Sequence, residues 1–169
     1  MKCEGALYNE YPRSTPVIEN AVWVAAIVLG AAILAPVHAA AAVAYAAYSV
    51  ACLYLLIPRL VCTRCGYFGS TCHSGQGKIA ALLFSPRDPS GFEASFRWMR
   101  LAAPVFLAPL VAGLPLLAIE FSMLRLVLLA AFAVTALGVT RLVTQRLGCA
   151  HCRQKAACPA CPACPGGEV

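Results

Sequence analysis

The sequence predicts an all-α membrane protein with four transmembrane helices in two tandem hairpins, each hairpin followed by a cytoplasmic cysteine-rich knuckle. The 169-residue chain is 61% hydrophobic and only 12% charged, and its mean hydropathy is +0.76. Soluble domains carry about 25% charged residues. The apolar residues form four long tracts. The motif Arg-Leu-x-Cys-x-x-Cys follows the second tract and again the fourth.

Each tract is long enough to span a bilayer, because a transmembrane helix needs about 20 mostly apolar residues. The tracts cover residues 17–35, 37–57, 101–119 and 123–143. They lack the polar face that a helix on a soluble surface requires. Small residues at positions 39–47 are expected to let helices approach closely. The prolines of the third tract are expected to kink it, with neighbouring helices satisfying the freed carbonyl groups.

The distribution of positive charge predicts the orientation. Of the 13 Lys and Arg residues, all except Arg125 lie before the first tract, between the second and third, or at and beyond the end of the fourth. The positive-inside rule assigns that side to the cytoplasm. We therefore expect a multi-pass protein of a prokaryotic inner membrane, with both termini cytoplasmic. The mostly polar first twenty residues predict no cleavable signal peptide.

The tracts and motifs divide the chain into five parts. These are a polar cytoplasmic N-terminus (1–16), hairpin 1 with its knuckle (17–75), a cytoplasmic or interfacial linker (76–100), hairpin 2 with its knuckle (101–158) and a low-complexity tail (159–169). The motif copies are 87 residues apart, measured from Cys62 to Cys149. Agreement in sequence and in position after a hairpin predicts a tandem duplication.

Six cysteines are the candidate metal ligands: Cys62, Cys65, Cys72, Cys149, Cys152 and Cys158. The cytoplasm keeps thiols reduced, which favours metal binding over a disulfide framework. A structural zinc ion takes four tetrahedral ligands, and two Cys-x-x-Cys pairs supply four thiolates. The leading hypothesis joins the Cys-x-x-Cys pairs of both motifs in one zinc site, with the third cysteine of each motif close by.

Other ligand sets remain open. Each motif can form its own site, the first completed by His73 or Cys3 and the second by Cys161 or Cys164. Six thiolates can also hold a binuclear site or an iron–sulfur cluster. Cys52 lies within the second tract and is expected to be a small packing residue.

The remaining polar groups predict little chemistry. Glu19, His38, Glu120 and Arg125 lie near the ends of tracts, where polar side chains are easily solvated, so no proton or ion conduit is expected. No serine–histidine or paired-carboxylate arrangement for hydrolysis is evident. The sequence therefore favours a protein that is not an enzyme. Its basic residues form no dense run with interleaved aromatics, which argues against nucleic-acid binding.

The stretches CTRCGYFGSTCHSGQGKIAALLF and CAHCRQKAACP resemble a set of small prokaryotic integral membrane proteins of unknown function. Those proteins have a cysteine-rich loop ending in a glycine-rich turn and a second cysteine cluster at the C-terminus. The resemblance covers roughly a quarter of the chain. It implies that the two cysteine clusters belong together, and it implies no activity.

The predicted function is that of a scaffold, accessory subunit or interaction protein with a structural zinc site. Its expected partners are the lipid bilayer and another protein of a membrane complex. One alternative is a redox protein that carries an iron–sulfur centre or reactive dithiols. Another is a protein that handles or transports soft metal ions, because thiolates bind such ions well.

Overall fold

The computed structural model describes residues 7–155, 158–159 and 161. Its α-helices are α1 (Ser14–Leu34), α2 (Ala39–Ala51), α3 (Ile57–Leu60), α4 (Gln76–Leu83), α5 (Phe92–Ser95), α6 (Ala103–Ile119), α7 (Met123–Ala133) and α8 (Thr140–Val143). Short π-helical or 3-10 turns continue several of these helices. Within the described residues there is no strand, and the one β-bridge joins Tyr8 to Cys152. The predicted all-α class is confirmed.

Four continuous helical runs are long and apolar enough to cross a membrane: Ser14–Leu34, Ala39–Arg64, Pro89–Ile119 and Met123–His151. They match the four predicted tracts, which indicates a multi-pass membrane protein. The third run begins at Pro89, before its predicted start at residue 101. The fourth run ends at His151, after its predicted end at residue 143. Both extensions are short helical turns of more polar sequence, which hydropathy alone assigns to the loops.

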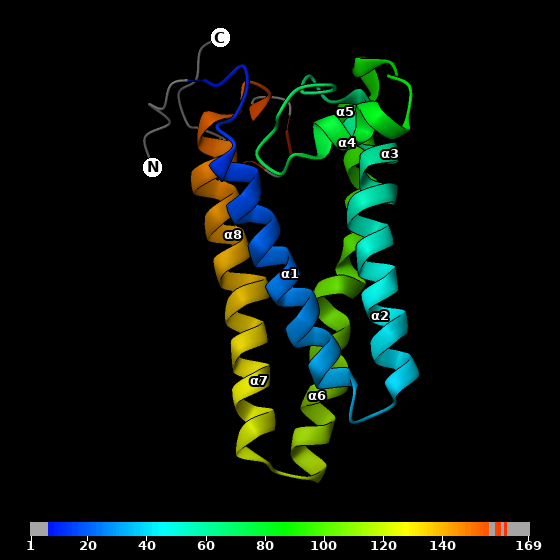
Figure 1. Ribbon diagram of the computed structural model, residues 1–169, viewed down its shortest axis with the longest axis vertical. Coiled ribbons are helices and arrows are strands. Elements are labelled where there is room, and N and C mark those ends of the chain that lie inside the picture. The colour runs from blue at the N-terminus through cyan, green and yellow to red at the C-terminus, as the bar shows by residue number, and fades with distance from the viewer. Residues whose placement is uncertain (1–6, 156–157, 160, 162–169) are drawn as a thin grey trace.

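The four runs form a bundle in which α1 is central (Figure 1). Helix α1 packs against α2, α6 and α7. One buried cluster includes Ile27, Tyr45 and Val105, so it joins α1 to α2 and α6. A second includes Ala26 and Phe132 and joins α1 to α7. Because α1 contributes to both clusters, the helical runs share one interior. The arrangement as two tandem hairpins and its origin by duplication stay predictions.

Close helix contacts occur at two glycines. A Cβ atom at Gly30 would lie 2.8 Å from Cγ of Pro109, and one at Gly113 would lie 2.6 Å from Cδ2 of Leu129. The expected contact surface at residues 39–47 is wrong in most of its positions. Of the alanines there, Ala42 is buried and Ala46 is half-buried against the core, whereas the helix turns the others outward. Helix crossing in this bundle therefore depends on the glycines of α1 and α6.

The proline-rich third run is helical throughout α6, although Pro109 and Pro115 lie inside it. Just before α6, the carbonyl group of Leu101 accepts hydrogen bonds from the Tyr48 hydroxyl group at 2.7 Å and from the Cys52 thiol at 3.3 Å. Cys52 is fully buried. It packs in the core, as expected from the sequence, and also donates to a neighbouring helix.

Candidate functional site

The two cysteine motifs end the second and the fourth helical runs and lie at the same end of the bundle (Figure 1). Their backbones match closely. In each motif the amide of the second cysteine donates to the carbonyl of the first, at 3.2 Å for Cys65 and 3.3 Å for Cys152. The second cysteine is then extended, with φ −78° in both copies and ψ 142° or 123°. The repeated sequence therefore folds into the same local turn twice.

Direct hydrogen bonds join the two motifs. The side-chain oxygen of Gln154 accepts from the Cys65 thiol and from the Gly66 amide, each at 2.9 Å. The Arg153 amide donates to the Tyr67 hydroxyl oxygen at 3.1 Å. The Arg153 side chain donates to the Gly66 carbonyl group and lies over the Tyr67 ring, 4.6 Å from its centroid. Residues that directly follow each Cys-x-x-Cys pair thus connect the two halves of the chain.

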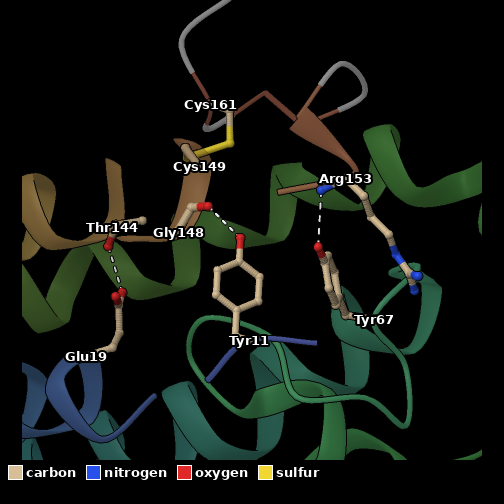
Figure 2. Close-up of a disulfide and its surroundings, with 8 residues drawn as sticks. All are labelled: Tyr11, Glu19, Tyr67, Thr144, Gly148, Cys149, Arg153 and Cys161. Atoms are coloured by element: carbon tan, nitrogen blue, oxygen red, sulfur yellow. Dashed lines mark hydrogen bonds between the residues drawn. A yellow bond between two sulfur atoms is a disulfide. The ribbon is translucent and has the colours of Figure 1, made fainter. Parts of the chain in front are cut away.

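The segment before α1 adds a second connection (Figure 2). The Tyr8 amide donates to the His151 carbonyl at 3.0 Å, and the Tyr67 hydroxyl donates to the Tyr8 carbonyl at 2.6 Å. The Tyr11 hydroxyl donates to the Gly148 carbonyl at 2.6 Å. Tyr11 and Tyr67 are almost completely buried. Burial without an acceptor would be costly for these hydroxyl groups, so the bonds fix the N-terminal segment across both motifs.

The third cysteine of the first motif lies in a glycine-bearing turn. The Cys72 sulfur accepts a hydrogen bond from the Gly77 amide at 3.3 Å and contacts the Ser74 hydroxyl at 3.5 Å. Gly75 has φ 75°, a value that favours glycine. A Cβ atom at Gly77 would lie 2.6 Å from the Ser70 carbonyl oxygen. The two glycines let the chain turn tightly into α4 while an amide points at the sulfur.

Cys149 and Cys161 form a disulfide bond (Figure 2). Their Cα atoms are 5.4 Å apart, which is within the usual range for a disulfide. Successive turns return the chain to Cys149, since the Cys158 amide donates to the Lys155 carbonyl at 3.4 Å and the Cys161 amide to the Cys158 carbonyl at 3.1 Å. The expectation that the cysteines are all reduced is therefore wrong for this pair.

The other five predicted ligands are free thiols, namely Cys62, Cys65, Cys72, Cys152 and Cys158. Within residues 7–155, 158–159 and 161, no three His, Cys, Asp or Glu side chains converge into a group that could hold a metal ion. Cys3 and Cys164 lie outside the described residues. The structure thus gathers the predicted ligands at one end of the bundle, with Cys149 bonded to Cys161.

Burial and neighbouring sulfur atoms control the acidity of these thiols. Burial raises the pKa of Cys65 to about 12, and the nearby Cys72, Cys152 and Cys158 add to the increase. Burial also raises the pKa of Cys152, although an amide hydrogen bond from Gln154 opposes the increase. Without a cation, the thiols of Cys65 and Cys152 are protonated at neutral pH and are weak nucleophiles.

His73, expected as an alternative ligand beside Cys72, lies against the second motif. A Cβ atom at Gly148 would be 2.9 Å from Cδ2 of the His73 ring. Burial lowers the pKa of His73 to about 4, so its imidazole is neutral at pH 7. Gly148 therefore supplies the space in which the His73 ring packs close to Cys149.

The ionisable groups near the helix ends divide into two kinds. Glu120 and Arg125 are at the surface and form an ion pair of 2.8 Å, and His38 is exposed and caps α2 by accepting from the Ala40 amide. These three occupy solvated boundary positions, as expected. Glu19 does not, because its side chain is 1% exposed. The fourth run contacts it, since the Thr144 hydroxyl group donates a hydrogen bond to its Oε1, and hydropathy does not reveal this contact.

Sequence analysis also missed Tyr8, Tyr11, Tyr67 and Gln154 as parts of this site. Their one visible signal is position, since each tyrosine or glutamine lies within a few residues of an apolar tract or a cysteine.

No family model, curated protein or solved structure matches the chain.

Proposed function

We propose that this multi-pass membrane protein binds a zinc ion with the thiolates of its two cysteine motifs and acts as a scaffold or accessory subunit of a membrane complex. The motifs would face the cytoplasm of a prokaryotic cell. The ion would be structural, and it would fasten the end of the second helical run to the end of the fourth. The observation that carries this proposal is the direct bonding of the Cys65 segment to the Cys152 segment through Gln154.

The donor chemistry fits a soft or borderline cation. Five free thiols lie at one end of the bundle, and thiolate is the preferred ligand of zinc in structural sites. The Gly77 amide donates to the Cys72 sulfur. Such a hydrogen bond stabilises sulfur most when it carries negative charge. Cys62, Cys65, Cys72 and Cys152 would supply the ligands, with Cys158 beside them and Cys149 available after reduction of its disulfide.

Zinc binding would require the thiols to lose their protons and to draw together. Because metal ligation needs deprotonated sulfur, binding releases protons and becomes stronger as pH rises. Burial is the main cause of the raised pKa of Cys65, and the neighbouring Cys72, Cys152 and Cys158 add to it. A bound cation would oppose both effects by stabilising the thiolate form.

Metal analysis of protein purified anaerobically without added metal tests the proposal. We expect a stoichiometric amount of zinc in the natural chain. Cys65→Ser and Cys152→Ser should each abolish most of the bound zinc, and the double variant should lose no more than either single variant. Cys52→Ala is the matched control, since its thiol lies in the membrane core and donates to Leu101. Absence of stoichiometric metal, or additive partial losses, would contradict a shared site.

The disulfide favours a second candidate, thiol–disulfide exchange. Cys152 is a free thiol three residues after Cys149. Once ionised, the Cys152 thiolate can attack the Cys149 sulfur, forming a Cys149–Cys152 disulfide and breaking the Cys149–Cys161 bond. Because burial raises the pKa of Cys152, the exchange is expected to be slow at neutral pH and to become faster as pH rises. Cys161 leaves as a thiolate and takes up a proton, so the exchange needs no external oxidant. Mapping of disulfides by mass spectrometry after acid quenching would detect the Cys149–Cys152 product.

The alternative of an iron–sulfur cluster has its own test. Visible absorption that bleaches with dithionite would identify such a cluster.

The cytoplasmic orientation rests on the positive charges. The end that carries the cysteines has Arg13, Arg59, Arg64, Arg146 and Arg153, whereas Arg125 lies at the start of α7, at the opposite end. A topology reporter fused after Val169 should be active in the cytoplasm. Activity of a periplasmic reporter at that position would reverse the proposed orientation.

A further inference from the structure

Glu19 is a carboxyl group buried inside the membrane-spanning bundle. It lies in α1, within a run that is long and apolar enough to cross a membrane, and its side chain is 1% exposed. The other acidic residues that the structure describes, Glu10, Asp88, Glu93 and Glu120, are exposed. Among the described acidic residues, Glu19 is therefore the one whose side chain is buried.

Its two oxygen atoms have different surroundings (Figure 2). Oε1 accepts a hydrogen bond of 2.7 Å from the Thr144 hydroxyl group. Oε2 is buried and has no hydrogen-bond partner. Thr144 begins the π-helical turn Thr144–Gly148 in the fourth run. Such turns alter the direction of side chains within a helix and are frequent at functional sites.

Within the part of the chain that the structure describes, no basic side chain forms an ion pair with this carboxyl group. Arg141 and Arg146, the basic residues of the fourth run nearest to Thr144, are exposed. On the second run, the Tyr54 hydroxyl group donates to the side-chain oxygen of Asn20 at 2.6 Å. Tyr11 donates to the Gly148 carbonyl group. The titratable groups of the elements around Glu19 are thus directed to other partners or to the surface.

A buried carboxylate with one neutral hydrogen-bond donor is strongly unfavourable, and such a group takes up a proton or a cation instead. A metal cation would need several oxygen ligands, and within the described residues the hydrogen-bond partners of the Glu19 side chain supply one hydroxyl group besides its own carboxyl group. We propose that Glu19 is a proton-binding site, with the proton on Oε2 and the Thr144 hydroxyl group on Oε1. This site is separate from the cysteine motifs and does not depend on metal binding.

Infrared spectroscopy of the full-length protein at neutral pH, in vesicles of ether-linked lipids that have no ester carbonyl groups, tests this proposal. A neutral carboxylic acid absorbs in a region that carboxylates and amides leave free. Glu19 is the buried side chain among the described acidic residues, so we expect one such band, which Glu19→Gln removes. The band should shift in deuterium oxide, because the exchanging proton is bound to the carboxyl group itself.

Thr144→Val provides an independent assignment if Glu19→Gln fails to fold. Loss of the hydrogen bond to Oε1 should shift the same band to higher frequency. Thr135→Val is the matched control, because Thr135 lies on the fourth run and its carbonyl, not its side chain, is the group that accepts from Thr140. The proposal is overturned if the spectrum of the natural chain lacks the neutral acid band, or if subtraction of Glu19→Gln reveals a pair of carboxylate bands. It is also overturned if Thr144→Val leaves the band unmoved.

Discussion

The hydroxyl group of Tyr45 donates a hydrogen bond of 2.9 Å to the carbonyl oxygen of Val105. In a regular α-helix that carbonyl would accept from the amide four residues later, and residue 109 is a proline without an amide proton. Helix α6 nevertheless continues through Pro109. Tyr45, on α2, thus replaces the missing backbone donor inside the membrane, where water cannot do so.

Tyr45→Phe should destabilise the bundle by about 1–2 kcal/mol, because the Val105 carbonyl then has no donor in an apolar environment. Hydrogen bonds between membrane helices contribute about 0.6 kcal/mol on average. We expect a larger loss here because residue 109 is a proline and supplies no backbone donor to the Val105 carbonyl group. The free energy of unfolding in mixed micelles, measured by denaturant titration, checks the difference.

A second substitution separates this explanation from simple loss of packing. Pro109→Ala restores an amide donor to the Val105 carbonyl group. In the Pro109→Ala background, Tyr45→Phe should therefore cost less than in the natural chain. Equal costs in both backgrounds would show that Tyr45 does not act through the proline-freed carbonyl.

Gly77→Ala should destabilise the cysteine-bearing end by about 3 kcal/mol, because an added Cβ atom meets backbone carbonyl groups that cannot rotate away. Its nearest neighbours would be the Tyr67 and Ser70 carbonyl oxygens. The shift should also weaken the bond from the Gly77 amide to the Cys72 sulfur. Gly138→Ala is the matched control, since no atom lies within 4 Å of a Cβ atom there. Thermal unfolding should separate the two variants, and similar losses in both would contradict the steric explanation.

The positions of the helices could be predicted from the sequence, but which helices pack against one another could not. Four apolar tracts and the repeated Arg-Leu-x-Cys-x-x-Cys motif predict four spans and two cysteine segments after the second and fourth, because hydropathy and spacing are local properties. The central place of α1 depends on contacts at Gly30 and Gly113, and no local pattern marks those two glycines among 12 in the chain. The burial of Glu19 likewise depends on Thr144, which is 125 residues away.

The candidate site likewise has features that could be predicted from the sequence and features that could not. The local turn of each Cys-x-x-Cys pair follows from its own sequence, and both copies adopt it. The pairing of Cys149 with Cys161 depends on how the chain turns after Lys155, and the bridge from Cys65 to Gln154 depends on the packing of the whole bundle. Tertiary contacts of this kind leave no periodic signal in the sequence.

Tyr11→Phe should cost about 1–2 kcal/mol of stability, since Tyr11 is 3% exposed and its hydroxyl group is the donor to the Gly148 carbonyl oxygen. The loss should loosen the segment before α1 from both cysteine motifs, so amide hydrogen exchange should become faster at residues 8–12 and 148–152. Tyr8→Phe is the matched control. Tyr8 joins the site through its backbone and through the stacking of its ring on His151, with centroids 4.5 Å apart, and phenylalanine keeps both. Faster exchange in Tyr8→Phe to the same extent would mean that the hydrogen bond to Gly148 is not what holds the segment in place.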